Sequence, residues 1–375
     1  MKKILHDLQS TDEAERIYAA QDIGERRNPD MAAQLIRRLT VETSQLVKDA
    51  IVFNLKKMPC HRIYEELFRL FASSDAFLRN AAVAVFGSEK DAAIAFLTAH
   101  LDHANREVRK LILDALFLTG TPEARLAIRA GLHDPSINVQ ITAVEYLGTM
   151  EDRGSIDDML LLLEKKTEPM LRCTILDSLA RISTDGIIQK VMAVLGAEED
   201  INRIEAVFIP GVIRLAAQSG DLDFICKVFE TIKDLHTYAD DIMRAVGETR
   251  RHFKNILDEC CVLDMVVSMA KNPRLREDVR YGAVELILSD DQKLLKGGEL
   301  LSLGNALISE PSMIYAGVRL LALSEEKSGM DTIREIITET KDEELRSLCE
   351  ELSGDSPKPS LCAENGGQKR GIYHP

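Results

Sequence analysis

Apolar residues recur along this chain at intervals of three and four, which is the spacing of one buried helix face. The segment "DPSINVQITAVEYLG" (residues 134–148) combines an Asp-Pro break, a Val-Gln step, an Ala three residues later and a closing Leu-Gly. Similar segments occupy residues 106–117, 76–87 and 169–180, with weaker copies at 13–24 and 44–55. The pattern therefore predicts a repeated helix.

One residue marks each copy, and in five of the seven copies it directly follows an apolar residue. The markers are Arg16, Lys48, Arg79, Arg109, Gln140, Arg172 and Arg203, separated by 32, 31, 30, 31, 32 and 31 residues. We expect small residues three positions after a marker to allow close helix packing, and apolar residues seven positions after it to fill the seam between helices. The small residues are Ala19, Ala82, Ala143 and Ala206, and the apolar ones are Ile23, Phe86, Leu116, Leu147 and Leu179.

A second apolar segment with helical spacing precedes the marked helices, as in "ARLAIRAGLH" before residue 137. Breaks that contain Asp, Ser, Thr or Pro separate the two segments, and Gly24, Gly87, Gly120 and Gly148 are expected at helix ends or in the following turns. Each unit is thus predicted to be a pair of antiparallel helices. Because one pair cannot bury both of its faces, we expect an all-α solenoid of about ten to eleven stacked pairs.

The repeat resembles the short HEAT-like repeat of the phycobilin-lyase type, on the segments "DPSINVQITAVEYLG" and "REVRKLILDALF". We expect regular HEAT-like repeats over residues 1–215 and divergent ones over 216–352. Within the latter, the irregular stretch 237–272 predicts helices of unequal length, a kink or a widened turn. Residues 353–375 have the Pro, Gly and polar content of a disordered tail.

The net charge of -14 is unevenly distributed. Residues 1–60 carry ten Lys/Arg and nine Asp/Glu, a net +1, which leaves 37 against 52, or -15, for residues 61–375. This charge balance disfavours nucleic acid as the main partner and favours a protein partner with a basic segment. The absence of Trp and the acidic charge also argue against a DNA glycosylase, a class that uses HEAT-like repeats.

The seven cysteines are scattered without a CxxC pair, which is typical of reduced thiols in a cytosolic protein. The adjacent Cys260 and Cys261 are interpreted as buried apolar thiols, with a redox pair as the alternative. The N-terminal segment does not have the pattern of a signal peptide, and no apolar run has the length of a membrane span. A cytoplasmic location is therefore expected.

Two columns of charged residues run through the repeats. Asp12, Asp75 and Glu168 each lie four residues before a marker Arg, which predicts an acid at the helix start and an Arg one turn later that ties one repeat to the next. The second column holds Asp114, Glu145 and Asp177, each five positions after its marker. This column is either solvated surface or an electronegative strip that binds a basic segment of a partner.

Catalytic, cofactor-binding and metal-binding motifs are not recognised in the sequence. HEAT-like repeats also form di-iron deoxyhypusine hydroxylases, whose ligands are His-Glu pairs, but no His here precedes a Glu. His100 and His103 lie three apart and would need a third ligand to hold a metal. The sequence favours a non-enzymatic scaffold or regulatory adaptor that binds proteins; the resemblance implies the alternative of a bilin-lyase-like subunit acting on a linear tetrapyrrole. The sequence specifies neither the partner nor the oligomeric state.

Overall fold

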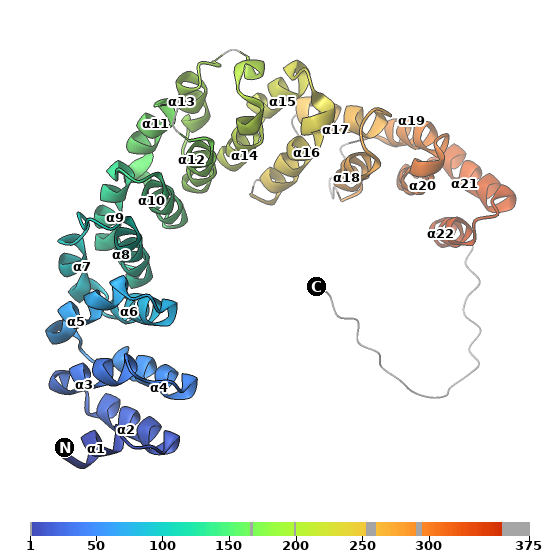
Figure 1. Cartoon of the computed structure of the whole chain (residues 1–375). Coiled ribbons are helices and arrows are strands. Elements are labelled where there is room, and N and C mark those ends of the chain that lie inside the picture. The colour runs from blue at the N-terminus through green and yellow to red at the C-terminus, as the bar shows by residue number, and fades with distance from the viewer. Residues whose placement is uncertain (1, 166–167, 199, 253–259, 290–294, 355–375) are drawn as a thin grey trace, which may run out of the picture. The chain divides into compact units, whose positions relative to one another are not determined.

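A computed structural model describes residues 2–165, 168–198, 200–252, 260–289 and 295–354. These residues form 22 α-helices, joined by loops and short 3-10 turns, and contain no strand. The expected all-α solenoid of ten to eleven helix pairs is confirmed (Figure 1). Within the described ranges, no helix is long and apolar enough to cross a membrane.

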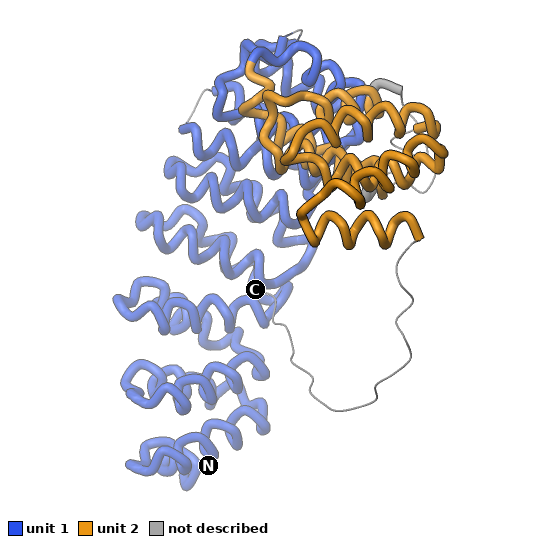
Figure 2. The backbone as a smooth tube through the Cα atoms, turned by 90° about the vertical axis from the view of Figure 1, so that its right-hand side faces the viewer, with its two compact units in different colours: residues 1–233 blue, residues 234–375 orange. Residues whose placement is uncertain are grey.

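The chain divides into two compact units (Figure 2). Unit 1 comprises residues 1–233. Its helices are α1 (Lys2–Asp7), α2 (Glu13–Arg26), α3 (Pro29–Leu39), α4 (Gln45–Leu55), α5 (Tyr64–Arg69), α6 (Ala76–Ser88), α7 (Asp91–Thr98), α8 (Arg106–Thr119), α9 (Pro122–Arg129), α10 (Ile137–Thr149), α11 (Ile156–Glu164), α12 (Pro169–Ile182), α13 (Ile187–Val194), α14 (Ile209–Ser219) and α15 (Leu222–Thr231).

Unit 2 comprises residues 234–375. Its helices are α16 (Leu235–His252), α17 (Cys260–Lys271), α18 (Glu277–Leu288), α19 (Gly297–Ile308), α20 (Ile314–Leu323), α21 (Lys327–Glu339) and α22 (Glu343–Ser353). In the irregular stretch, α16 has 18 residues and α17 has 12, so the helices are unequal in length as expected. Residues 253–259, part of the stretch 237–272 for which a kink or a widened turn is predicted, lie outside the described residues, as do the side chains of Cys260 and Cys261. Of the predicted tail 353–375, Ser353 ends α22 and Gly354 caps it, and residues 355–375 lie outside the described residues.

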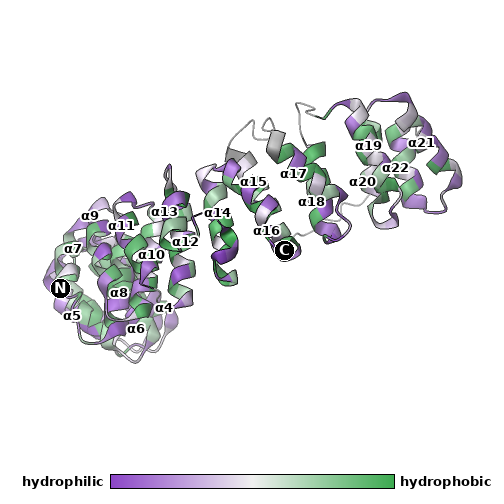
Figure 3. Ribbon diagram, turned by 90° about the horizontal axis from the view of Figure 1, so that it is seen from above, coloured by the Kyte–Doolittle hydropathy of each residue, from purple (hydrophilic) through white to green (hydrophobic). Residues whose placement is uncertain are grey.

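Successive even-numbered helices of unit 1 pack side by side (Figure 1). We call α2, α4, α6, α8, α10, α12 and α14 the even layer. Hydrophobic and hydrophilic residues alternate along these helices, as one buried face requires (Figure 3). The predicted seam residues are buried: Ile23, Phe86, Leu116 and Leu147 have 0% of their surface exposed and Leu179 has 1%. Ala19, Ala82 and Ala143 are buried beside them.

The prediction was wrong for the seventh copy. Arg203 ends a 3-10 turn (Ile201–Arg203), and the exposed Ala206 lies in a second turn (Ala206–Phe208), because the helix begins only at Ile209. Asp177 contacts Arg214 across 37 residues, whereas Asp114 contacts Tyr146 across 32. The step into α14 is therefore five residues longer than the repeat period.

Three of the four glycines lie in the last turn of their helices, where adjacent helices approach closely. A Cβ atom on Gly24 would stand 2.2 Å from Asn54 Oδ1, and one on Gly148 would stand 2.5 Å from Ser178 Oγ. On Gly87 it would stand 2.5 Å from Leu118 Cβ. Gly120 has a different role, since its φ of 67° ends α8 in the left-handed conformation.

Buried arginines tie neighbouring repeats together, as expected. Arg109 donates Nε and Nη2 to the two carboxylate oxygens of Asp134 at 2.7 and 2.8 Å, and Nη1 to the His103 carbonyl at 2.8 Å. Arg16 bonds Glu42 through Nε and Nη2 at 2.9 and 3.2 Å in the same way. The acids that precede the markers differ in what they contact: Asp12 accepts from the Ala14 amide at 2.7 Å, whereas Asp75 accepts from the Phe77 amide at 2.8 Å and also pairs with Lys48 of the preceding repeat at 3.6 Å.

The link is missing after the third repeat. Glu42 and Asp134 each stand six residues before the next marker, and His103 occupies that position before Arg109. Accordingly, the Arg79 guanidinium is bonded within the described chain only to the carbonyls of Ser73 and Ser74, at 2.7 and 3.1 Å. Arg79 therefore holds its own turn without an ion pair to the fourth repeat.

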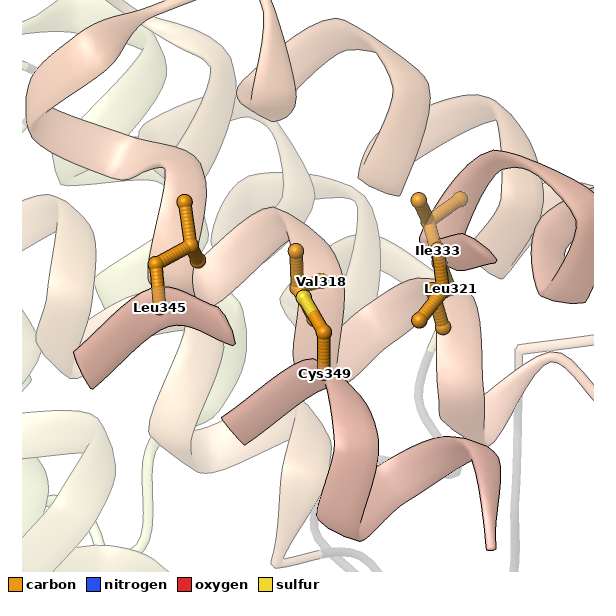
Figure 4. Packing of buried hydrophobic residues seen from close by; sticks show 5 residues of the cluster. All are labelled: Val318, Leu321, Ile333, Leu345 and Cys349. Atoms are coloured by element: carbon orange, nitrogen blue, oxygen red, sulfur yellow. The ribbon is translucent and has the colours of Figure 1, made fainter. Parts of the chain in front are cut away.

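A small hydrophobic cluster holds the last helices of unit 2 together (Figure 4). Val318 and Leu321 from α20 meet Ile333 from α21, and Leu345 and Cys349 from α22. Burial raises the pKa of the Cys349 thiol to about 11. Cys349 thus behaves as a small apolar residue, like Cys60 in unit 1, where burial raises the thiol pKa to about 12.

Leu147→Ala is expected to destabilise unit 1 by about 2 to 5 kcal/mol, because it empties a fully buried position in the seam between repeats. The loss should concentrate in α8, α10 and α12, since each repeat contacts only its neighbours. Hydrogen exchange measured helix by helix tests this. Uniform loss of protection across unit 1 would contradict a locally stacked array.

His103→Asp is expected to stabilise unit 1 by about 1 kcal/mol, because it places a carboxylate where Arg79 lacks one. His100→Asp is the matched control. His100 packs its ring 4.4 Å from Phe68 and 4.5 Å from Phe96 between centroids, so that substitution should destabilise. Urea unfolding of both variants and of the wild type measures the change in the free energy of unfolding. Destabilisation by His103→Asp would refute the inference that residue 103 stands opposite Arg79 as Asp134 stands opposite Arg109.

Glu42 should make the first repeats sensitive to acid. Burial raises its pKa, but hydrogen bonds from the Ser44 amide, Arg16, Arg38 and the Thr43 amide lower it from 4.5 to about 2. Its stabilisation is therefore complete above pH 4.5 and is lost as the pH falls, by about 2 kcal/mol at pH 3. Hydrogen exchange of α2 and α4 at several pH values should show this loss, and Glu42→Gln should abolish it.

Candidate partner-binding surface

The three predicted acids lie on adjacent helices of the even layer. Asp114 is on α8, Glu145 on α10 and Asp177 on α12. Asp114 and Asp177 are half-buried, whereas Glu145 is exposed. The three carboxylates differ in what they contact, and this difference determines which of them can meet a partner.

Asp114 is engaged by the next repeat. The Tyr146 hydroxyl donates a hydrogen bond to Asp114 Oδ1 at 2.6 Å, and the Tyr146 ring stacks on Phe117 with centroids 4.1 Å apart and planes 6° from parallel. Burial raises the pKa of Asp114, and this effect outweighs the Tyr146 hydrogen bond and the nearby Lys110. Burial and the contact with Asp114 raise the pKa of Tyr146 in turn. Asp114 therefore joins α8 to α10.

Asp177 is engaged in the same direction along the array. Its carboxylate forms an ion pair with Arg214 on α14, and both side chains are 42% exposed. Unit 2 contains a similar pair, in which Glu285 on α18 meets Arg319 on α20. Acids at this position thus bind a side chain of the following repeat.

Glu145 differs because the following repeat offers no long side chain. Ser178 occupies the place that Tyr146 takes opposite Asp114, and its hydroxyl donates to the Val144 carbonyl at 3.0 Å. Among the described residues, no side chain bonds or pairs with the Glu145 carboxylate. Glu145 is therefore the acid of this column whose charge faces only solvent.

Exposed apolar side chains on the same helices were missed by the sequence argument. Met170 is 64% exposed and Ile137 is 39% exposed. They precede Asp177 and Glu145 by seven and eight residues, about two helical turns, so the apolar and acidic side chains share a helix face. A hollow of about 650 Å³ adjoins Ile137, between the first turns of α8 and α10. The sequence signal that could have located these exposed side chains is an apolar residue at a helix position outside the seam.

The two histidines are occupied by local contacts. His100 Nδ1 lies 2.8 Å from the Phe96 carbonyl, and His103 Nδ1 accepts a hydrogen bond from the Asn105 amide at 3.1 Å. Within the described chain, no three His, Cys, Asp or Glu side chains gather as metal ligands. Both rings instead pack against Phe68.

The comparisons agree with this architecture. A family model described as HEAT repeats matches residues 94–180 and 125–208, so this part of the chain contains HEAT repeats. The more specific phycobilin-lyase type stays a prediction. No curated protein gives a significant match to the chain.

Several solved structures share the fold. A crystal structure of Kap121p matches with a TM-score of 0.56 and 12% identity, over 93% of this chain and 44% of that one. Kap121p bound to Pho4p matches with a TM-score of 0.57 and 11% identity, over 93% and 44%. Kap121p bound to Nup53p matches with a TM-score of 0.57 and 11% identity, over 94% of this chain and 45% of that one. The chain spans less than half the length of these proteins, and the likeness shows the fold alone.

Proposed function

We propose that this protein is a non-enzymatic scaffold or regulatory adaptor that binds a protein through the even layer of unit 1. The observation that carries the proposal is the shared face of α10 and α12, where the free carboxylate of Glu145 lies with the exposed Ile137 and Met170. The HEAT repeats and the likeness to Kap121p, a protein crystallised with Pho4p, Nup53p and RanGTP, support an interaction role.

The chemistry of this face favours a partner segment that contains both basic and apolar residues. Lysine or arginine would meet Glu145, while an apolar side chain would cover Met170 and Ile137. The net charge of -15 over residues 61–375 would attract such a segment and repel nucleic acid. A cytoplasmic location, inferred from the cysteine pattern, completes the proposal. Neither the HEAT-repeat match nor the Kap121p structures favours the bilin-lyase alternative.

Glu145→Lys should weaken binding of a basic partner several-fold and slow its association, while the helical signal in circular dichroism stays unchanged. Raising the salt from 0.1 M to 1 M shortens the Debye length from about 10 Å to about 3 Å and should mimic the substitution. Partners are identified by pull-down from native lysate with mass spectrometry, and their affinities are then measured by titration. The triple reversal of Asp114, Glu145 and Asp177 should weaken binding further.

Glu164→Lys is the matched control, because Glu164 is an exposed acid on α11, outside the even layer, and its reversal changes the net charge equally. The triple variant also removes the Tyr146 hydrogen bond and the Arg214 ion pair, so its helical signal and unfolding must be measured beside its affinity. Equal affinities for the wild type, Glu145→Lys and Glu164→Lys would refute a role for this face.

A further inference from the structure

A second surface hollow lies in the even layer between the last turns of α2 and α4, which pack side by side (Figure 1). Its volume is about 500 Å³, and its lining includes two cations, Arg27 and Lys57, and one acid, Glu25, together with Phe53 and Asn54. The hollow belongs to residues 1–60, which carry a net +1, whereas the rest of the chain carries -15. Its chemistry therefore differs from that of the acidic column.

The backbone holds this hollow in a defined form. Gly24 leaves room for Asn54, whose amide nitrogen donates to the Ala50 carbonyl at 2.8 Å. Arg27 ends α2 with a φ of 48°, and its Nε donates to the Lys57 carbonyl at 3.0 Å. This hydrogen bond joins the ends of the two helices and holds the guanidinium at the hollow.

The side chains at the rim combine positive charge with an exposed aromatic ring. Phe53 is 58% exposed, and the Lys57 ammonium lies 3.7 Å from the centroid of its ring. Within the described ranges, Arg27, Lys56 and Lys57 pair with no carboxylate, whereas Arg26 pairs with Asp22. Cations at helix ends complement the helix dipole, and the exposed part of the Phe53 ring adds an apolar surface beside them.

We infer that this hollow binds an acidic peptide segment that carries an aromatic or aliphatic side chain. Carboxylates of the segment pair with Arg27 and Lys57 in the hollow and with the exposed Lys56 next to Lys57 in the sequence, and its apolar side chain packs on Phe53. A nucleic acid is disfavoured, because three cations on a chain with a net charge of -14 fall short of the concentrated basic charge that phosphate backbones require. The site goes beyond the proposed function, since its ligand is opposite in charge to the one that Glu145 would bind.

The probe is a fluorescein-labelled peptide of four glutamates around one phenylalanine, titrated with the full chain and followed by fluorescence anisotropy. Two further peptides serve as controls, one with the phenylalanine replaced by alanine and one with the glutamates replaced by lysine. The variants are Lys56→Glu with Lys57→Glu, which reverses the charge, and Phe53→Ala, which removes the ring. Lys190→Glu is the matched control, because Lys190 is an exposed lysine on α13. All substituted residues are exposed, and circular dichroism verifies the fold.

The wild type should bind the acidic peptide saturably, and the alanine peptide more weakly. The double reversal should weaken binding at least about tenfold and Phe53→Ala several-fold, whereas Lys190→Glu should have little effect. No saturable binding by the wild type, equal binding by the double reversal, or an equal loss in Lys190→Glu would overturn the inference. The proposed function is separable, because only partner binding depends on Glu145 and only the acidic peptide depends on Lys56 and Lys57.

Discussion

The structure depends on a buried guanidinium that joins each linked repeat to the next. Arg16 and Arg109 bind carbonyl oxygens of their own turn and, with their remaining donors, both oxygens of a carboxylate in the following repeat. Because these bonds are directional and a buried arginine without its carboxylate is costly, a repeat cannot slide against its neighbour. The apolar seam supplies most of the buried area, and the arginines determine how that area is aligned.

The sequence specified the helix pairs, the seam and most of the period, because small and apolar residues at fixed spacings have few alternatives to stacked helices. It failed at Arg203 for a physical reason. The residues around Arg203 resemble the repeat in sequence, but they form two short 3-10 turns, and α14 begins five residues later than the repeat period predicts. Glycines were located correctly, whereas the neighbours that they admit, such as Asn54 and Ser178, could not be inferred, because they belong to the next repeat.

The acidic column was foreseeable only in part. The spacing of Asp114, Glu145 and Asp177 was sufficient to place them on one face of adjacent helices. Their availability depends on the residue opposite each acid, which is Tyr146, Ser178 or Arg214. Each acid stands five residues after its marker, whereas the opposite residue, such as Tyr146, stands six residues after the next marker. Helix packing sets this offset of one residue, and the repeat period alone does not predict it. A column of identical charges can therefore contain two acids that are engaged by the next repeat and one whose charge faces solvent.

The carboxylates that stand six residues before a marker, Glu42 and Asp134, have a consequence for how such a chain can change length. Excising one period after Arg109 would bring Lys166, instead of Asp134, to the position that receives its guanidinium. The buried Arg109 guanidinium would then lose the carboxylate that it binds, although the helices themselves would still have the correct spacing. The copies are alike in shape but are not interchangeable, because Arg109 keeps its ion pair only where the incoming neighbour carries an acid at this position. The order of the repeats is thus as much a part of the fold as their number.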